Sequence, residues 1–129
     1  MLRHVPAAVS LILALGPALG ACSQSPQAPG DAGVCYHLAS LDGGQAKFNV
    51  VARAVPDMEH CAADLEAMRI RFLNLGGGQS EIAGAYQGNF LFLQQEGVFT
   101  SSTYGGVRYP FLVRTGDGRL AAPGAMPSQ

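Results

Sequence analysis

An apolar stripe of helical period, between residues 58 and 75, constrains the fold more than any other feature of the sequence. Apolar residues recur at spacings of three and four, which places them on one face of an α-helix: Met58, Cys61, Leu65, Met68, Phe72 and Leu75. Asp57 is a favourable N-cap, and the glycines at 76–78 end the helix. We therefore expect a helix whose whole stripe packs against a sheet.

The segments around this helix alternate between apolar and polar residues, which indicates β-strands. One strand is expected at 47–55, and four more at 81–87, 89–95, 98–104 and 107–113. Segment 89–95 is apolar on both faces and should be central, whereas Pro110 marks 107–113 as an edge strand. The sequence predicts an α+β fold in which one amphipathic helix packs on an antiparallel sheet, in the order strand, helix, four-strand meander.

The first 21 residues have the layout of a secretory signal peptide. Arg3 supplies a positive charge, and a 16-residue apolar stretch follows from Val5 to Gly20. A membrane-spanning helix needs about 20 apolar residues, and Pro6 and Pro17 interrupt both ends of this stretch. The pattern favours export over a membrane span.

The residues that end the leader, Leu19-Gly20-Ala21-Cys22, resemble the lipobox of bacterial lipoproteins. The resemblance covers residues 1–22 only. It implies cleavage before Cys22, acylation of its sulfur and new amino group, and attachment to a membrane through lipid. Ser23, in place of Asp, weakly favours the outer over the inner membrane, with the domain facing the periplasm. The alternative is ordinary cleavage after residue 20, which would release a soluble protein.

The cysteine count agrees with lipidation. Export places the chain in an oxidising compartment, and an anchor at Cys22 leaves Cys35 and Cys61 to form one disulfide. The alternative is a zinc site made of these two cysteines with His37 and His60. Neighbouring helix residues point about 100° apart, so residues 60 and 61 are poorly placed to share a metal. We expect a disulfide, no metal and no cofactor.

Composition divides the chain beyond residue 21 into three parts. Residues 22–33 contain two prolines and no apolar period, so they read as a flexible tether. Residues 34–120 form a small α+β domain, and residues 121–129 read as a disordered tail. Because the domain is this small, a covalent crosslink is expected to help stabilise it.

Several functional classes are excluded or disfavoured. Arg3 is one of eight Lys and Arg residues, so seven remain beyond the leader against nine Asp and Glu, a net charge of −2. This balance excludes nucleic-acid binding through a basic surface. No G-x-S-x-G motif is present, the glycines at 76–78 follow a helix rather than precede one, and Asp64 and Glu66 are expected to point into solvent. We expect no enzymatic activity.

Two surfaces are candidates for binding a partner. Arginine and tyrosine side chains on the polar strand faces could grip a protein or an anionic polymer: Arg53, Arg108, Arg114, Tyr86 and Tyr104. The edge of 107–113 could accept a strand from another chain.

The sequence predicts a lipid-anchored, non-catalytic module that engages another envelope component, a protein or peptidoglycan glycan. The alternative is a periplasmic enzyme inhibitor or a small-ligand carrier. A cavity between helix and sheet would favour the carrier, and a cleft with His37 or His60 beside a carboxylate would favour an enzyme.

Overall fold

The computed structural model describes residue 16, residues 25–78 and residues 81–124. The signal peptide predicted at 1–21 (apart from residue 16), the lipid site Cys22 and the last five residues lie outside the described residues. The elements are β1 (Cys35–Asp42), β2 (Gln45–Ala52), α1 (Met58–Asn74), β3 (Ile82–Tyr86), β4 (Asn89–Gln94), β5 (Gly97–Ser101), β6 (Tyr109–Arg114) and β7 (Leu120–Ala121). No helix in the described segments is long and apolar enough to cross a membrane.

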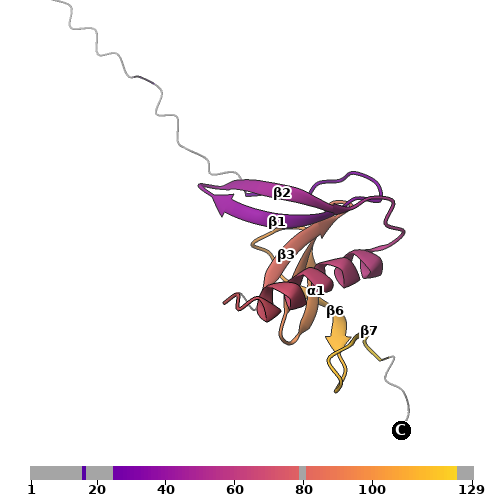
Figure 1. The fold of residues 1–129 in the computed structure, drawn as a ribbon. Coiled ribbons are helices and arrows are strands. Elements are labelled where there is room, and N and C mark those ends of the chain that lie inside the picture. Colours follow the sequence, from indigo (N-terminus) through magenta and orange to yellow (C-terminus); the bar gives the residue numbers. More distant parts are fainter. Residues whose placement is uncertain (1–15, 17–24, 79–80, 125–129) are drawn as a thin grey trace, which may run out of the picture.

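All seven strands form one antiparallel sheet in the order β2-β1-β3-β4-β5-β6-β7, and α1 crosses one of its faces (Figure 1). The predicted α+β class is confirmed, and β4 is the middle strand as expected. Two strands were not predicted: β1, which precedes the predicted first strand, and the two-residue β7.

The edges of the sheet differ from the prediction. β6 lies between β5 and β7, so the prediction that 107–113 is an edge strand is wrong; the edges are β2 and β7. Pro110 is tolerated in β6 because β7 pairs only with Val113 and Arg114, beyond the proline. Among the strands that the structure describes, the free edge with a full-length strand is therefore that of β2.

The core lies between α1 and the sheet. Asp57 caps the helix by accepting a hydrogen bond from the backbone N–H of His60 at 2.8 Å. Cys61 and Leu65 are fully buried against side chains from the sheet: Ile82, Leu91, Leu93, Val98 and Leu112. Cys61 is bonded to Cys35, with their Cα atoms 5.3 Å apart, so the disulfide joins α1 to β1 inside this core.

The last part of the apolar stripe is exposed, contrary to the prediction that all of it packs against the sheet. The side chains of Phe72 and Leu75 are 37% and 79% exposed. Phe72 contacts the ring of His37, which is the last β1 residue paired with β3. Beyond this point β1 and β3 are no longer paired, and Leu75 follows the last residue of α1.

The segment before β1 is attached to the domain. The carbonyl of Pro29 accepts a hydrogen bond from the Gly88 N–H at 2.9 Å, and the Gly33 N–H donates to the side chain of Gln87 at 2.9 Å. Both partners lie in the turn between β3 and β4. The ordered domain therefore begins by Pro29, and residues 29–33 are not part of a free tether.

Candidate functional site

Tyr86 does not lie on a binding surface. Its side chain points toward α1, is 4% exposed and donates a hydrogen bond to the Val55 carbonyl at 2.6 Å. The hydroxyl therefore fixes the chain between β2 and α1. The prediction that Tyr86 is available to a partner is wrong, because the strand alternation did not reveal which face the helix covers.

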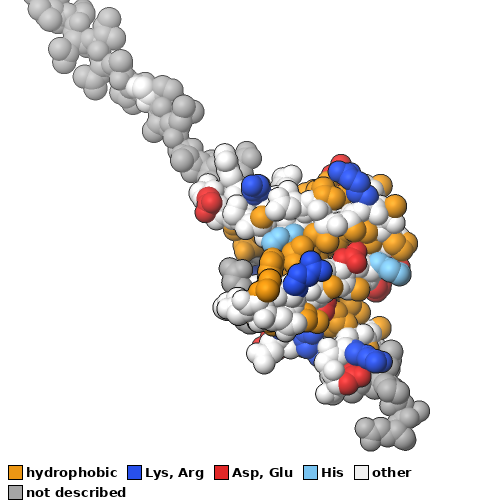
Figure 2. All heavy atoms as spheres, in the orientation of Figure 1, with side chains coloured by type: hydrophobic (Ala, Val, Ile, Leu, Met, Phe, Trp, Pro, Cys, Tyr) orange, Lys and Arg blue, Asp and Glu red, His pale blue; other side chains and the backbone are white. Residues whose placement is uncertain are grey.

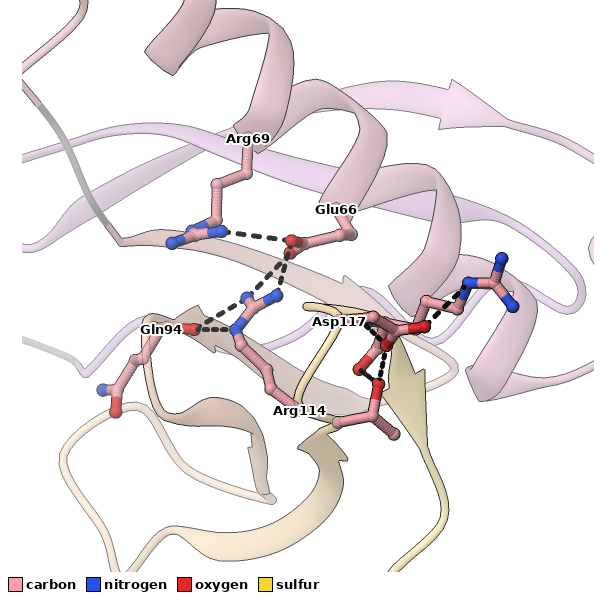
Figure 3. A network of polar contacts seen from close by, with 7 residues as sticks. Glu66, Arg69, Gln94, Arg114 and Asp117 are labelled. Carbon is pink, nitrogen blue, oxygen red and sulfur yellow. Dashed lines mark hydrogen bonds and ion pairs between the residues drawn. The ribbon is translucent and has the colours of Figure 1, made fainter. Parts of the chain in front are cut away.

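Arg114 is also directed toward α1, where it forms a buried charge cluster with Glu66 and Arg69 (Figure 3). The guanidinium of Arg114 contacts both oxygens of Glu66 at 2.7 and 3.0 Å and also donates to the Gln94 carbonyl. Arg69 contacts the same carboxylate at 3.1 Å. The three side chains are only 15%, 10% and 9% exposed for Arg114, Glu66 and Arg69. The predictions of a solvated Glu66 and a surface Arg114 are wrong, and the cluster instead attaches β6 to the helix.

Tyr104 and Arg108 are brought together on the face of the sheet opposite α1. The Arg108 guanidinium lies 3.6 Å above the ring of Phe92 and forms an ion pair with Glu81 at 3.0 Å. The Tyr104 ring packs against Phe90 and Phe92, with ring centroids 5.6 and 5.8 Å apart. Both phenylalanines are fully buried. We call this pair the Tyr104–Arg108 surface; it is the part of the predicted binding surface that the fold assembles.

Arg53 is exposed but belongs to another part of the molecule. It follows β2, the first strand of the sheet, whereas Arg108 precedes β6, the sixth. Its charge acts on Tyr36, whose pKa is nevertheless raised because its hydroxyl hydrogen-bonds to Asp31. The five predicted residues therefore do not form one surface.

A cleft of about 260 Å³ separates β1 from β3 where the strands diverge. The strands pair only through Cys35–His37 and Gly84–Tyr86, and the cleft is lined by residues 37–41 and 81–83 together with Tyr104. We call it the β1–β3 cleft. It holds His37 and Glu81, which is the combination that would favour an enzyme.

The two groups do not form an acid–base pair in this structure. The oxygens of Glu81 accept hydrogen bonds from Arg108 and Gln94 at 3.0 and 3.2 Å. Burial lowers the pKa of His37, and its ring packs against Phe72. Within residues 25–78 and 81–124, no hydrogen bond or ion pair joins His37 to Glu81. The arrangement gives no positive support for catalysis at this cleft.

A second hollow, of about 380 Å³, lies between the edge strand and the helix. We call it the β2–α1 groove, and its lining residues are Val50, Val51, Ala52, Asp64, Ala67, Met68 and Arg71. Sequence reasoning missed it. Strand 47–55 was predicted, but its position at the sheet edge beside the helix follows only from the topology.

The alternative of a zinc site does not fit the cysteines. Cys35 and Cys61 are bonded to each other, which occupies both thiols, and the Nδ1 atom of His60 lies 2.6 Å from an oxygen of Asp57. The part of the chain that the structure describes has no group of three His, Cys, Asp or Glu side chains that could hold a metal ion.

No family model, curated protein or solved structure matches this chain.

Proposed function

We propose that the protein is an exported lipoprotein, anchored through Cys22, that serves as a non-catalytic binding module for another component of the cell envelope. One observation supports the proposal of a lipid anchor. The Cys35–Cys61 disulfide uses two of the three cysteines, so the remaining one is Cys22, at the position that resembles the acylated cysteine of a lipobox. An exported chain with one unpaired cysteine requires a role for that thiol, and lipidation supplies one.

The attachment of Pro29 limits how far such a domain extends from its membrane. Seven residue steps separate Cys22 from Pro29, a span of at most about 25 Å when fully extended. The partner is therefore sought close to the membrane surface. Ser23 favours the outer membrane for this position.

The packing supports a surface binder more than a small-ligand carrier. The disulfide and the core side chains pack between α1 and strands β3 to β6, and the hollow between α1 and the sheet lies at the exposed edge strand β2. On the opposite face, Tyr104 and Arg108 pack against the buried phenylalanines of β4. Open features of the described residues include the Tyr104–Arg108 surface, the β1–β3 cleft and the β2–α1 groove, all of which suit a protein or glycan partner. An enzyme inhibitor would bind through the same surfaces, and the identity of the partner distinguishes the two roles.

The anchor is tested by metabolic labelling with an alkyne fatty acid. We expect the wild-type chain to incorporate the probe and to fractionate with membranes. The Cys22→Ser variant should remain unlabelled and uncleaved or leave the membrane fraction. Equal labelling of the variant would contradict acylation at Cys22.

The binding role is tested by crosslinking in intact cells followed by affinity capture of the full-length protein. We expect an envelope protein or peptidoglycan fragments in the captured material, and we expect the amount to fall when Cys22→Ser removes the anchor. Capture of no envelope component under conditions that crosslink a known envelope complex would refute the proposal.

A further inference from the structure

We propose that the β2–α1 groove binds an extended polypeptide segment, which adds to the sheet as a new strand beside β2. This inference deepens the proposed binding function and rests on it, because it names the chemical class of the partner. It follows from three features that meet at one place: an open strand edge, a groove lined in part by apolar side chains, and two separated charges.

The open edge belongs to β2, which has β1 on one side and no described strand on the other (Figure 1). It pairs with β1 from Gln45 to Ala52, with one register shift at Val51 of β2 and another at Ala39 of β1. Its eight residues include one charged side chain, Lys47, and neither proline nor glycine. Proteins usually protect such edges with charges, proline, bulges or very short strands, and β2 has only Lys47 and the register shift at Val51 among these. The opposite edge, β7, has two residues, whereas β2 offers a full-length template for pairing.

The groove beside this edge offers room for side chains. Its β2 wall is Val50, Val51 and Ala52, and its helix wall includes Ala67 and Met68. Val51, Ala52 and Met68 are half-buried and Ala67 is exposed, so part of their apolar surface is available for burial. In a strand added beside β2, every second side chain would point toward the helix. An alternating apolar segment matches this arrangement, because backbone hydrogen bonds supply affinity and the groove selects side chains.

The charges at the helix wall add direction. Asp64 and Arg71 both line the groove, and they are seven residues apart on α1, or about 10.5 Å along its axis. That distance corresponds to about three residues of an extended strand. Within residues 25–78 and 81–124, neither side chain has a hydrogen bond or ion pair. A complementary segment carries a basic residue near Asp64 and an acidic residue near Arg71. This pattern of backbone, apolar and opposite-charge contacts favours a polypeptide over a glycan.

The experiment uses a random twelve-residue peptide library, selected against the full mature lipoprotein in detergent micelles. Enriched peptides are synthesised with a fluorophore, and their affinity is measured by fluorescence anisotropy. We expect alternating apolar residues flanked by one basic and one acidic residue. N-methylation of alternate backbone amides should weaken binding at least tenfold in one of the two possible sets, because only one set faces β2.

Two helix variants locate the binding site. Ala67→Glu places a long charged side chain in the groove and should weaken binding at least tenfold. Ala63→Glu makes the same change at an exposed position of α1 outside the groove lining, and it should leave the affinity unchanged. Asp64→Lys should select peptides in which the basic residue is lost or replaced by an acidic one.

Three results would overturn the inference: no enriched peptide, binding that Ala67→Glu does not weaken, or equal affinity of both N-methylated sets. Peptides that lose affinity with Arg108→Ala but not with Ala67→Glu would move the binding site to the Tyr104–Arg108 surface, so the inference would fail while a binding role remained. Failure of the proposed function has a different signature, an unlabelled Cys22 together with no captured envelope component.

Discussion

Gly84 determines how closely α1 approaches the sheet. A Cβ atom at this position would collide with the carbonyl oxygen of Tyr36 and with the methyl groups of Leu65. We predict that Gly84→Ala destabilises the domain by about 1–3 kcal/mol, the usual cost of overpacking a core. Gly105→Ala is the matched control, because its Cβ would meet no atom within 4 Å. Urea unfolding measures both, and equal midpoints would contradict the described packing.

Glu66 pairs with Arg114 through both of its oxygens in the buried cluster, so removing its charge leaves the Arg114 guanidinium without its carboxylate partner. We predict that Glu66→Gln lowers the free energy of unfolding by about 3–5 kcal/mol, as for other buried pairs that lose one partner. The exposed Glu96 provides the control: Glu96→Gln should leave the urea midpoint close to that of the wild type. If both variants unfold at the same midpoint, the cluster does not hold β6 to α1.

Predictions for single residues succeeded where the sequence pattern itself identified the buried face, as it did for the apolar stripe of the helix. Cys61 and Leu65 were placed on the buried helix stripe, and both are fully buried. Strand alternation correctly put Leu112 and Arg114 on one face of the same strand. Strand alternation could not show that α1 covers this face, so Arg114 was expected to be exposed to solvent. Glu66 of α1 was also expected to be exposed, whereas the two side chains form an ion pair inside the domain.

At the level of elements, the N-terminus of α1 carries a pH-sensitive cap. The hydrogen bond and charge of Asp57 raise the pKa of His60, and the His60 N–H lowers the pKa of Asp57. Stabilisation by His60 is complete below its unfolded pKa of about 6.5 and is lost as the pH rises through its raised value. Stabilisation by Asp57 is present above its unfolded value of 3.8 and is lost as the pH falls through its lowered pKa. The cap therefore contributes most in mildly acidic solution.

We predict that His60→Gln lowers the melting temperature more at pH 5 than at pH 8. Thermal unfolding followed by circular dichroism measures the difference at each pH. Asp57→Asn tests the same cap. In a protein that already carries Asp57→Asn, the loss of melting temperature caused by His60→Gln should depend less on pH. If the melting temperature of the wild type exceeded that of His60→Gln by more at pH 8 than at pH 5, the predicted direction of the pH dependence would be wrong.

The strands were predicted to different degrees for physical reasons. β3 to β6 alternate clearly, and glycine-containing turns separate β3, β4 and β5, so their positions agree with the prediction within a few residues, the largest differences lying at the end of β5 and the start of β6. β7 has two residues, too few for any period. β1 mixes small, polar and apolar side chains on both faces, and only its pairing with β2 and β3 makes it a strand. The β2–α1 groove could not be predicted, because it depends on that pairing order.

At the level of the whole molecule, the disulfide fastens the helix to β1 across 26 positions of sequence. We predict that the Cys35→Ala, Cys61→Ala double variant loses about 3–4 kcal/mol of stability, as expected for closing a loop of that length in the unfolded chain. Urea unfolding of the variant and of the reduced wild type should give similar midpoints, well below that of the oxidised protein. Cys22→Ser should leave the midpoint unchanged, and a midpoint unaffected by reduction would contradict the role of the bond.

The assignment of all three cysteines is tested most directly by the intact mass of the unreduced protein extracted from membranes. Fragmentation in the same experiment locates each modification. We predict a chain that begins at Cys22, carries acyl groups on that residue and lacks two hydrogens because Cys35 is joined to Cys61. A chain that begins elsewhere, or one in which Cys22 bears a free thiol, would contradict the proposed lipid anchor.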